Sequence, residues 1–489
     1  MSSTRRFCLA LGVAGALALS ACSSLKSYKP VIPDAAAIPL CEPDRSDDPE
    51  RAGSVDKACR ETASERAAAY TLHFVEFDDQ GWVFDDDQAQ IDSAIDKIKR
   101  SLQAGKRLRL FVYVHGWRHS AKYDDSNLRD FRLFLNETRA ATRCGGAEIA
   151  AVRTDSPSSI QSSLERCKNG ASDEEIVGIY VGWRGLPIRD GSPLTYLTFW
   201  DRKRTADRIA QGSVRELFGR LNALAGRYPD ATVTTAKTGS AASARQPSRL
   251  RTQVIGHSFG ASIVFRALSQ SIIDSFDHDL DGEVTSVTRF VDRVVLINPA
   301  IEASRFEPVR SAAMKRVEYC LRANPADPIR CERPAYQGAV LAVFTSEGDL
   351  ATKTFFPIGS ILSNTFETTR SERQTTAMNT TVGWDDGFRT HQLRAVTAPC
   401  TGASSDSPHR PGADGVDRID PPGWAWCLTD SALLQHLPTS AGQPTYNGPF
   451  WAVRVARQIV RDHNDIWNPR FRSVLLRVFA DEPRFPTLR

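Results

Sequence analysis

A short apolar stretch that ends in a glycine-flanked serine constrains this chain more than any other feature. Residues 251–255 favour a strand, Gly-His-Ser-Phe-Gly follows at residues 256–260, and residues 261–271 have the composition of a helix. Gly256 and Gly260, two positions before and after Ser258, allow a strained turn where backbone segments pass close together. The pattern predicts a nucleophile elbow, with Ser258 at a sharp turn between a buried strand and a helix.

Further apolar runs predict strands that are buried on both faces of a parallel sheet. These runs lie within residues 107–117, 176–181, 289–300, 339–349 and 449–456. Segments with helical periodicity lie between or after them, at residues 87–102, 127–142, 201–224 and 470–479. Residues 70–84 alternate apolar and polar side chains on both sides of an Asp-Gln-Gly turn, which predicts an antiparallel hairpin. We therefore expect an α/β fold with a mostly parallel sheet flanked by helices and an antiparallel N-terminal edge hairpin.

Residues with catalytic chemistry follow several of these strands. Catalytic side chains in open α/β sheets lie at the carboxyl ends of strands, where the loops converge. The strands are followed by His115-Gly116-Trp117, by Trp183-Arg184-Gly185, and by Ser258, Asn298, Asp349 and His463. The chain thereby resembles the α/β-hydrolase superfamily over roughly residues 70–350 and 445–485, because a triad in the order Ser, acid, His is typical of that family.

The resemblance implies a role for each member of a triad. Ser258 would be the nucleophile, because a serine hydroxyl attacks only when a base takes its proton. His463, between the last strand and the last helix, would be that base, and Asp349 would orient and stabilise its imidazole. Three alternatives stay open: Glu347 shares the strand face of Asp349, while His391 and His436 are rivals to His463.

An oxyanion that forms during attack needs preorganised N–H donors. The resemblance assigns these donors to the backbone of Trp117 and Phe259, with His115 and Gly116 as the supporting motif of the first loop. His257, beside the serine, is expected to point away from the nucleophile because neighbouring side chains of an elbow diverge.

Residues 351–448 separate the expected acid from the expected base and are too long for a simple connection. They hold several aromatic residues among polar, Gly-rich and Pro-rich stretches. We expect a cap insertion over the site in a single hydrolase domain, residues 65–489.

The N-terminal residues carry the signature of an exported lipoprotein. Arg5 and Arg6 precede an apolar run at residues 7–19 that is too short for a permanent membrane span. Leu19-Ser-Ala-Cys22 then resembles a bacterial lipobox, which implies that residues 1–21 are a signal peptide and that Cys22 carries the lipid. An ordinary cleaved signal peptide is the alternative. Residues 22–64 would form a tether and irregular segment, and the protein would be anchored in the bacterial cell envelope, on the periplasmic face of the outer membrane.

Export places the cysteines in a compartment that permits disulfides. Eight cysteines remain after Cys8 and Cys22 are set aside, and they fall into four couples of neighbours in the sequence. The expected pairs are Cys41 with Cys59, Cys144 with Cys167, Cys320 with Cys331, and Cys400 with Cys427. No Cys-x-x-Cys occurs, so the spacing disfavours zinc.

Charge and motif content limit the partners. Lys and Arg total 62 against 58 Asp and Glu, a balance that disfavours a nucleic-acid partner. Residues 277–282 match the first half of a calcium loop, but Thr288 stands where a bidentate acid is expected, so a solvated turn is favoured. We expect no cofactor and no metal.

Together these observations predict a lipid-anchored serine hydrolase that cleaves carboxylic esters through an acyl-enzyme. Its partners would be a small-molecule or lipid ester and the membrane that holds Cys22. The alternative is a non-catalytic anchored binding or envelope-assembly protein that retains the hydrolase fold.

Overall fold

The structure is a computed structural model of the chain. It describes residues 26–31, 38–41, 57–84, 88–144, 174–185, 198–230, 248–277, 291–323, 339–364, 367–396, 425–429, 431–437 and 448–479. The signal peptide, Cys22, residues 278–282 of the calcium-like loop and the cysteine pairs beyond Cys41 and Cys59 lie outside this description in whole or in part.

The described residues form an eleven-stranded mixed sheet in the order β1-β2-β4-β3-β5-β6-β7-β11-β8-β10-β9. The strands are β1 Ser64–Arg66, β2 Tyr70–Phe77, β3 Arg107–Val114, β4 Glu174–Trp183, β5 Leu250–His257, β6 Arg293–Ile297, β7 Leu341–Ser346, β8 His391–Ala395, β9 Ala425–Thr429, β10 Ala432–His436 and β11 Phe450–Val455. Every neighbouring pair from β2 to β8 is parallel, whereas β1, β10 and β9 pair antiparallel. The expectation of a mostly parallel sheet is confirmed.

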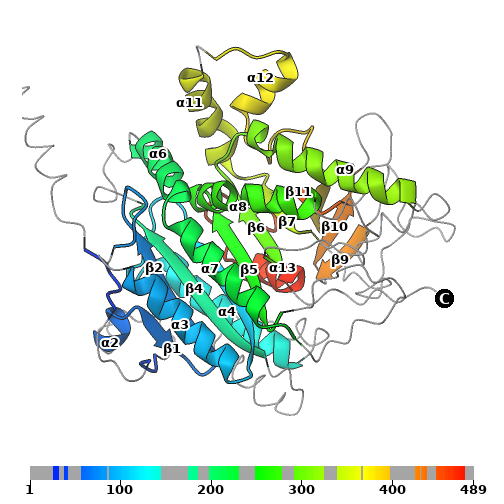
Figure 1. Ribbon diagram of the computed structural model, residues 1–489. Coiled ribbons are helices and arrows are strands. Elements are labelled where there is room, and N and C mark those ends of the chain that lie inside the picture. Colours follow the sequence, from blue (N-terminus) through cyan, green and yellow to red (C-terminus); the bar gives the residue numbers. More distant parts are fainter. Residues whose placement is uncertain are drawn as a thin grey trace, which may run out of the picture.

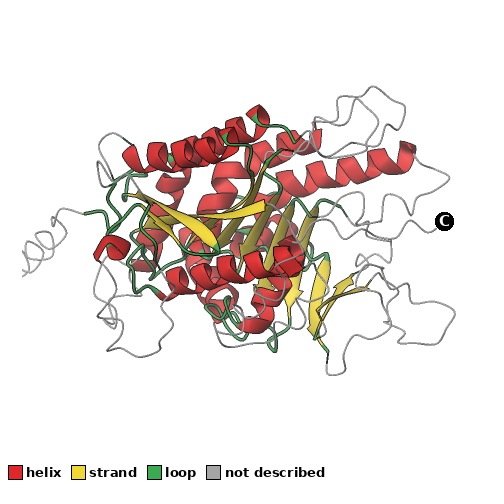
Figure 2. Cartoon of the chain, turned by 90° about the horizontal axis from the view of Figure 1, so that it is seen from below, coloured by secondary structure: helices red, strands yellow, loops and turns green. Residues whose placement is uncertain are grey.

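Helices cover both faces of this sheet (Figure 2). They are α2 Lys57–Arg60, α3 Ala89–Gln103, α4 Ser126–Cys144, α6 Thr198–Gln211, α7 Val214–Arg227, α8 Phe259–Asp277, α9 Glu307–Ala323, α11 Phe356–Ser363, α12 Glu372–Asn379 and α13 Pro469–Phe479, with shorter turns at Ala303–Phe306 and Ala351–Phe355. The helices α3, α7 and α8 pack in front of the sheet in the view of Figure 1, and α4 lies behind it. The buried side chains form two apolar clusters, one holding α3, α7 and α8 and the other holding α4 and α13. The central strands are therefore buried on both faces, as their near-continuous apolar sequences require.

The antiparallel edge differs from the expected hairpin over residues 70–84. Its first arm is β2, but the return arm makes only one bridge, from Val83 to Phe77. The carboxylate of Asp78 accepts the N–H groups of Gln80 and Trp82 at 2.8 and 2.9 Å, so the turn closes but the pairing ends at once. The antiparallel edge strand is instead β1, which the sequence placed at the boundary of an irregular segment.

The single helix expected at residues 201–224 is two helices, α6 and α7. The break falls at Gly212 and Ser213, where the turn after β2 inserts. Ser213 donates its N–H to the carbonyl of Gly81 at 2.9 Å, and a Cβ on Gly212 would overlap that same carbonyl. Contact with a distant turn therefore divides a segment whose own periodicity is continuous.

The insertion at residues 351–448 contributes to two different parts of the molecule. Its first part forms α11 and α12, which project beyond the body at the top of Figure 1. Its later strands β8, β10 and β9 extend the sheet past β11. The second half therefore continues the sheet, whereas the sequence treats the whole insertion as a cap.

The N-terminal region is attached to the domain. Cys41 and Cys59 form the expected disulfide, which confirms that pair. Lys29, which the sequence places in a polar tether, is fully buried, and its Nζ donates to the carbonyl of Cys59 at 3.1 Å. At least residues 27–30 thus pack on the domain.

Candidate active site

The turn at Ser258 joins β5 directly to α8. Ser258 has a φ of 55°, in the left-handed region that non-glycine residues rarely occupy, and is 2% exposed. Such a conformation costs about 1–3 kcal/mol and persists only where the surroundings impose it. Here the N–H of Ser258 donates to the carbonyl of Ile297 on β6 at 3.0 Å, and its own carbonyl accepts from Ala300 at 3.3 Å. The strained strand–turn–helix geometry expected from the sequence is therefore present.

Close packing explains the two flanking glycines. A Cβ on Gly256 would lie 2.6 Å from the Cα of Ala261, and one on Gly260 would overlap the carbonyl oxygens of Val114 and His115. The first turn of α8 thus passes directly over the end of β3. Any side chain at either position would force the turn that holds Ser258 to move.

Ser258, His463 and Asp349 form a continuous hydrogen-bonded chain. The Nε2 of His463 lies 2.9 Å from the Oγ of Ser258, and its Nδ1 lies 2.9 Å from the Oδ1 of Asp349. Ser258 follows β5, Asp349 follows β7, and His463 lies between β11 and α13. Three loops that are distant in sequence thus meet at the carboxyl edge of the sheet, and all three residues named from the sequence are brought together.

Thr352 holds the carboxylate of Asp349. Its Oγ1 donates to Oδ2 at 2.5 Å and its N–H donates to Oδ1 at 3.1 Å, so both carboxylate oxygens have donors besides His463. Trp384 then donates its Nε1 to Thr352 Oγ1 at 3.1 Å. Asp349 is completely buried, whereas Glu347 is exposed. The structure therefore joins Asp349 to His463, and the alternative acid stays at the surface.

The loop that carries His463 is fixed through its backbone. The carbonyl oxygen of His463 accepts hydrogen bonds from Nε2 of His257 and from Nδ2 of Asn298, both at 2.9 Å. Asn298 has a φ of 46° and accepts the N–H of Ser346 on its Oδ1 at 2.9 Å. The sequence marked Asn298 only as a strand-end residue and His257 only as pointing away from the serine. The link of both to His463 depends on long-range contacts that no local pattern encodes.

The charge state of His463 is set by opposing effects. Burial lowers the pKa of the imidazole, but the charge and hydrogen bond of Asp349 and the charge of Asp462 raise it, and the net pKa lies above the ordinary 6.5. The side chain remains 18% exposed. A base of this kind accepts a proton readily and keeps one face open to a reactant.

The loop after β3 passes beside the serine. A Cβ on Gly116 would lie 2.9 Å from Ser258 Cβ and 2.8 Å from His257 Nδ1. Trp117 follows, and its ring packs on Phe199, which also contacts the ring of Phe259. The N–H of Phe259 is at the first position of α8, where helix geometry supplies no acceptor. The two residues assigned as backbone donors thus both contact the ring of Phe199.

His115 supports this loop as a neutral side chain. Its Nε2 accepts the N–H of Trp183 at 3.1 Å, so Nδ1 carries the proton and donates to the carbonyl of Gly116 at 2.9 Å. Burial lowers the pKa of His115 to about 4, which keeps the imidazole neutral at pH 7. The ring of His115 also stacks on Trp183. These contacts fix the path of Gly116 and Trp117.

The alternative histidines lie elsewhere in the sheet. His391 on β8 and His436 on β10 face each other in register, with ring centres 4.8 Å apart. Both are buried, and neither contacts Ser258 or Asp349 through any hydrogen bond in the described part of the chain. Within the described ranges, no group of three or more His, Cys, Asp or Glu side chains is arranged to hold a metal ion.

Comparison with protein-family models, with curated proteins and with solved structures finds no match to this chain.

Proposed function

We propose that the protein is a serine hydrolase with an α/β-hydrolase fold that cleaves carboxylic esters through an acyl-enzyme. The observation that carries the proposal is the chain from Ser258 Oγ to His463 Nε2 and from His463 Nδ1 to Asp349, built on a serine with a left-handed backbone. A binding protein has no need for a strained serine that is hydrogen-bonded to a base, because the strain lowers stability. This contact therefore favours catalysis over a binding role.

In the proposed reaction His463 takes the proton of Ser258 while Oγ attacks the carbonyl carbon of the ester. The electron pair of the C=O bond moves to the oxygen, which becomes an oxyanion. Asp349, held by Thr352, stabilises the imidazolium that forms. The intermediate then expels the alcohol, which receives the proton from His463, and leaves the acyl group on Ser258.

Water completes the cycle by the same steps. His463 takes a proton from the water, the hydroxide attacks the acyl carbon, and Ser258 leaves with the proton that His463 returns. The N–H groups of Trp117 and Phe259 are the proposed donors to both oxyanions, supported by the helix N-terminus at Phe259, whose partial positive charge favours an anion.

The proposal includes an envelope location and a cap. Residues 1–21 serve as the signal peptide, Cys22 carries the lipid, and α11 with α12 contributes the cap. None of the helices in the described ranges is long and apolar enough to span a bilayer.

A panel of p-nitrophenyl esters of rising acyl length tests the reaction class and finds the preferred substrate. We expect hydrolysis that saturates with substrate and a loss of about 10⁴-fold or more in kcat for Ser258→Ala, because triad members act as a unit. Glu347→Gln is the matched control, since that side chain is exposed. Folded wild-type protein that hydrolyses no ester in the panel faster than Ser258→Ala contradicts the proposal.

A further inference from the structure

Several exposed apolar side chains belong to segments at the edge of the sheet where Ser258 lies. Of the large apolar residues that are exposed in the described ranges, six belong to segments at or beside the carboxyl ends of strands. We call this set the apolar rim: Tyr28, Trp82, Leu350, Phe355, Ile358 and Ile361. Trp82 is 71% exposed and Leu350 is 62% exposed. Single exposed apolar residues are ordinary, but several at one edge of a sheet point to an interaction surface.

In the part of the rim that follows Asp349, apolar side chains lie on the exposed side of a helical segment. Phe355, Ile358 and Ile361 recur every three residues on one side of the segment 355–361 and are each at least 55% exposed. The other side faces inward, where Phe356 and Ser360 are fully buried and a Cβ on Gly359 would overlap the ring of Trp200. A surface helix normally turns its apolar side inward. Here both sides need an apolar or protein environment.

The rim lies on both flanks of Ser258. Trp82 follows β2, which is three strand positions from β5, while Leu350 follows β7, which is two positions from β5 on the other side. With about 4.8 Å between neighbouring strands, these flanks lie about 14 Å and about 10 Å from the serine strand. A flat surface that covers the rim therefore also covers the approach to Ser258.

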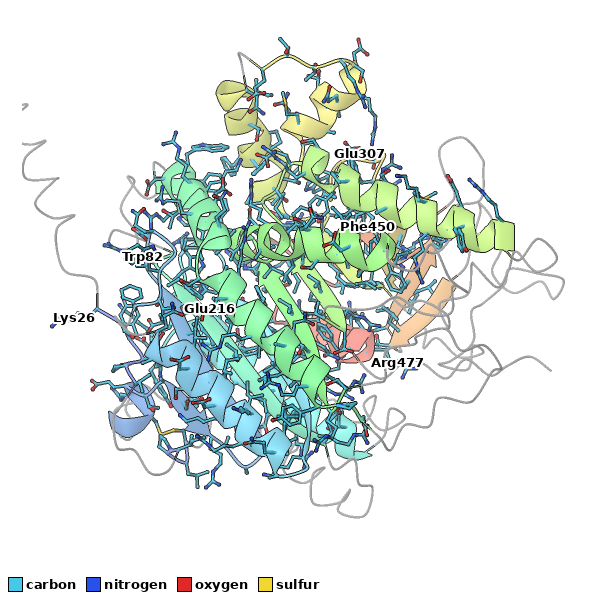
Figure 3. The ribbon with its side chains drawn as sticks, in the orientation of Figure 1. Lys26, Trp82, Glu216, Glu307, Phe450 and Arg477 are labelled. Atoms are coloured by element: carbon cyan, nitrogen blue, oxygen red, sulfur yellow. A yellow bond between two sulfur atoms is a disulfide. The ribbon has the colours of Figure 1, made fainter. Side chains whose placement is uncertain are left out.

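The N-terminal segment is attached to the domain at this same edge of the sheet. The N–H groups of Tyr28 and Lys29 donate to the carboxylate of Glu76, near the end of β2, at 3.1 and 2.8 Å. Gln90 donates to the carbonyl of Lys29 at 2.7 Å. The ammonium of Lys122, in the loop after β3, lies 5.5 Å from the ring centre of Tyr28. The chain is therefore attached to the domain beside the rim, and Figure 3 shows Lys26 and Trp82 on the same flank.

We propose that the apolar rim docks on a phospholipid bilayer, so that the edge of the sheet that holds Ser258 lies toward the membrane surface. The proposal rests on the lipid anchor of the proposed function. Only residues 23–26 separate Cys22 from the docked Ser27, and five residue steps span at most about 17 Å. An anchor that short keeps the flank with Tyr28 and Trp82 at the bilayer. Lys26 and Lys122 are exposed on this flank, and cationic side chains attract anionic headgroups. These constraints favour a bilayer over a protein partner.

Photo-crosslinking tests the docking surface. A benzophenone amino acid is introduced at Trp82 or Ile358 in the full chain, with Met314 on α9 as the control because it is exposed and apolar but outside the rim. Each protein is bound to vesicles of phosphatidylethanolamine and phosphatidylglycerol that carry a radiolabelled lipid, and is irradiated. We expect lipid adducts at positions 82 and 358 at least tenfold above those at position 314, in proteins that keep the wild-type melting temperature.

Adducts at position 314 that equal those at 82 and 358 contradict the docking surface, as does vesicle-bound protein without lipid adducts at either rim position. Protein that does not bind the vesicles also contradicts it. Ester hydrolysis by the same samples is measured in detergent, where no bilayer is needed. Loss of hydrolysis with adducts retained would therefore count against the proposed function and not against the surface.

Discussion

The imidazole of His257 donates through Nε2 to the backbone carbonyl of His463, 2.9 Å away, although 206 residues separate them. Nδ1 of His257 has no hydrogen-bond partner among the described residues. Burial and the nearby His463 hold the pKa of His257 well below 6.5, so this imidazole stays neutral. The residue next to the serine thus positions the loop that carries the base, without adding a charge beside it.

Replacing His257 by Phe removes this donor and keeps a ring of similar shape. We expect kcat to fall about fivefold with KM nearly unchanged, because loss of one neutral hydrogen bond costs about 1 kcal/mol and here misplaces only the base. His436→Phe is the matched control, a buried histidine outside the site. Steady-state kinetics of the two variants, compared at equal melting temperatures, separates an effect on the base from a general effect on the fold. A fall in kcat for His436→Phe that matches His257→Phe would show a purely structural effect.

Asp349→Asn tests the proposed acid. The asparagine amide has no charge with which to stabilise the imidazolium, and it favours the wrong tautomer of the His463 imidazole. We therefore expect kcat to fall about 10⁴-fold. Glu347→Gln should stay within twofold of wild type. If Glu347→Gln were the more damaging change, the acid would be misassigned.

The pH dependence of kcat/KM reports the charge of His463. The base works when neutral, and Asp349 and Asp462 raise its pKa against the lowering effect of burial. Activity should therefore rise with pH through a pKa above 6.5 and then level off. Asp462→Asn removes one raising charge, so the midpoint should move to lower pH with little loss at the plateau. A midpoint that moves upward in this variant would contradict the electrostatic account.

Buried neutral histidines predict acid sensitivity of the fold. Burial lowers the pKa of His436 and His115 to about 4, while the unfolded chain protonates near 6.5. Below pH 6.5 the unfolded state therefore binds protons that the folded state does not. As the pH is lowered from 6.5 to 4, the free energy of unfolding should fall by about 1.4 kcal/mol per pH unit for each of these two groups. Urea midpoints at pH 7, 6 and 5 measure this fall.

His436→Phe supplies the control for acid sensitivity. Its free energy of unfolding should depend less steeply on pH, by one proton. An unchanged slope would mean that His436 titrates normally in the fold.

The sequence predicted what depends on local pattern. Buried strands, the turn at Ser258 and the order Ser, Asp, His follow from apolar runs and from the residues at the strand ends. Because the carboxyl ends of parallel strands meet at one edge of a sheet, Asp349 and His463 could also be predicted to lie near Ser258. The sequence favoured Asp349 over Glu347 and His463 over His391. In the structure Asp349 is buried and forms a hydrogen bond with His463.

Contacts between residues that are far apart in the sequence could not be predicted from local pattern. The strand β8 has the mostly polar sequence His-Gln-Leu-Arg-Ala and joins the sheet between β11 and β10, two strands that pair with it from either side. Thr352 reads as one polar residue among many until its two hydrogen bonds to Asp349 are seen. Lys29 has the composition of a tether, and its burial depends on Glu76, Gln90 and the carbonyl of Cys59 gathering in space.

The central claim is that Ser258 is an activated nucleophile. The most direct measurement is reaction of the folded protein with a fluorophosphonate, followed by mass spectrometry of the peptide that contains residue 258. We expect one phosphonate adduct on Ser258 and at least about a hundredfold slower labelling in His463→Ala, which lacks the base. Folded wild-type protein that gains no adduct at Ser258, or that labels equally fast without His463, would contradict the account.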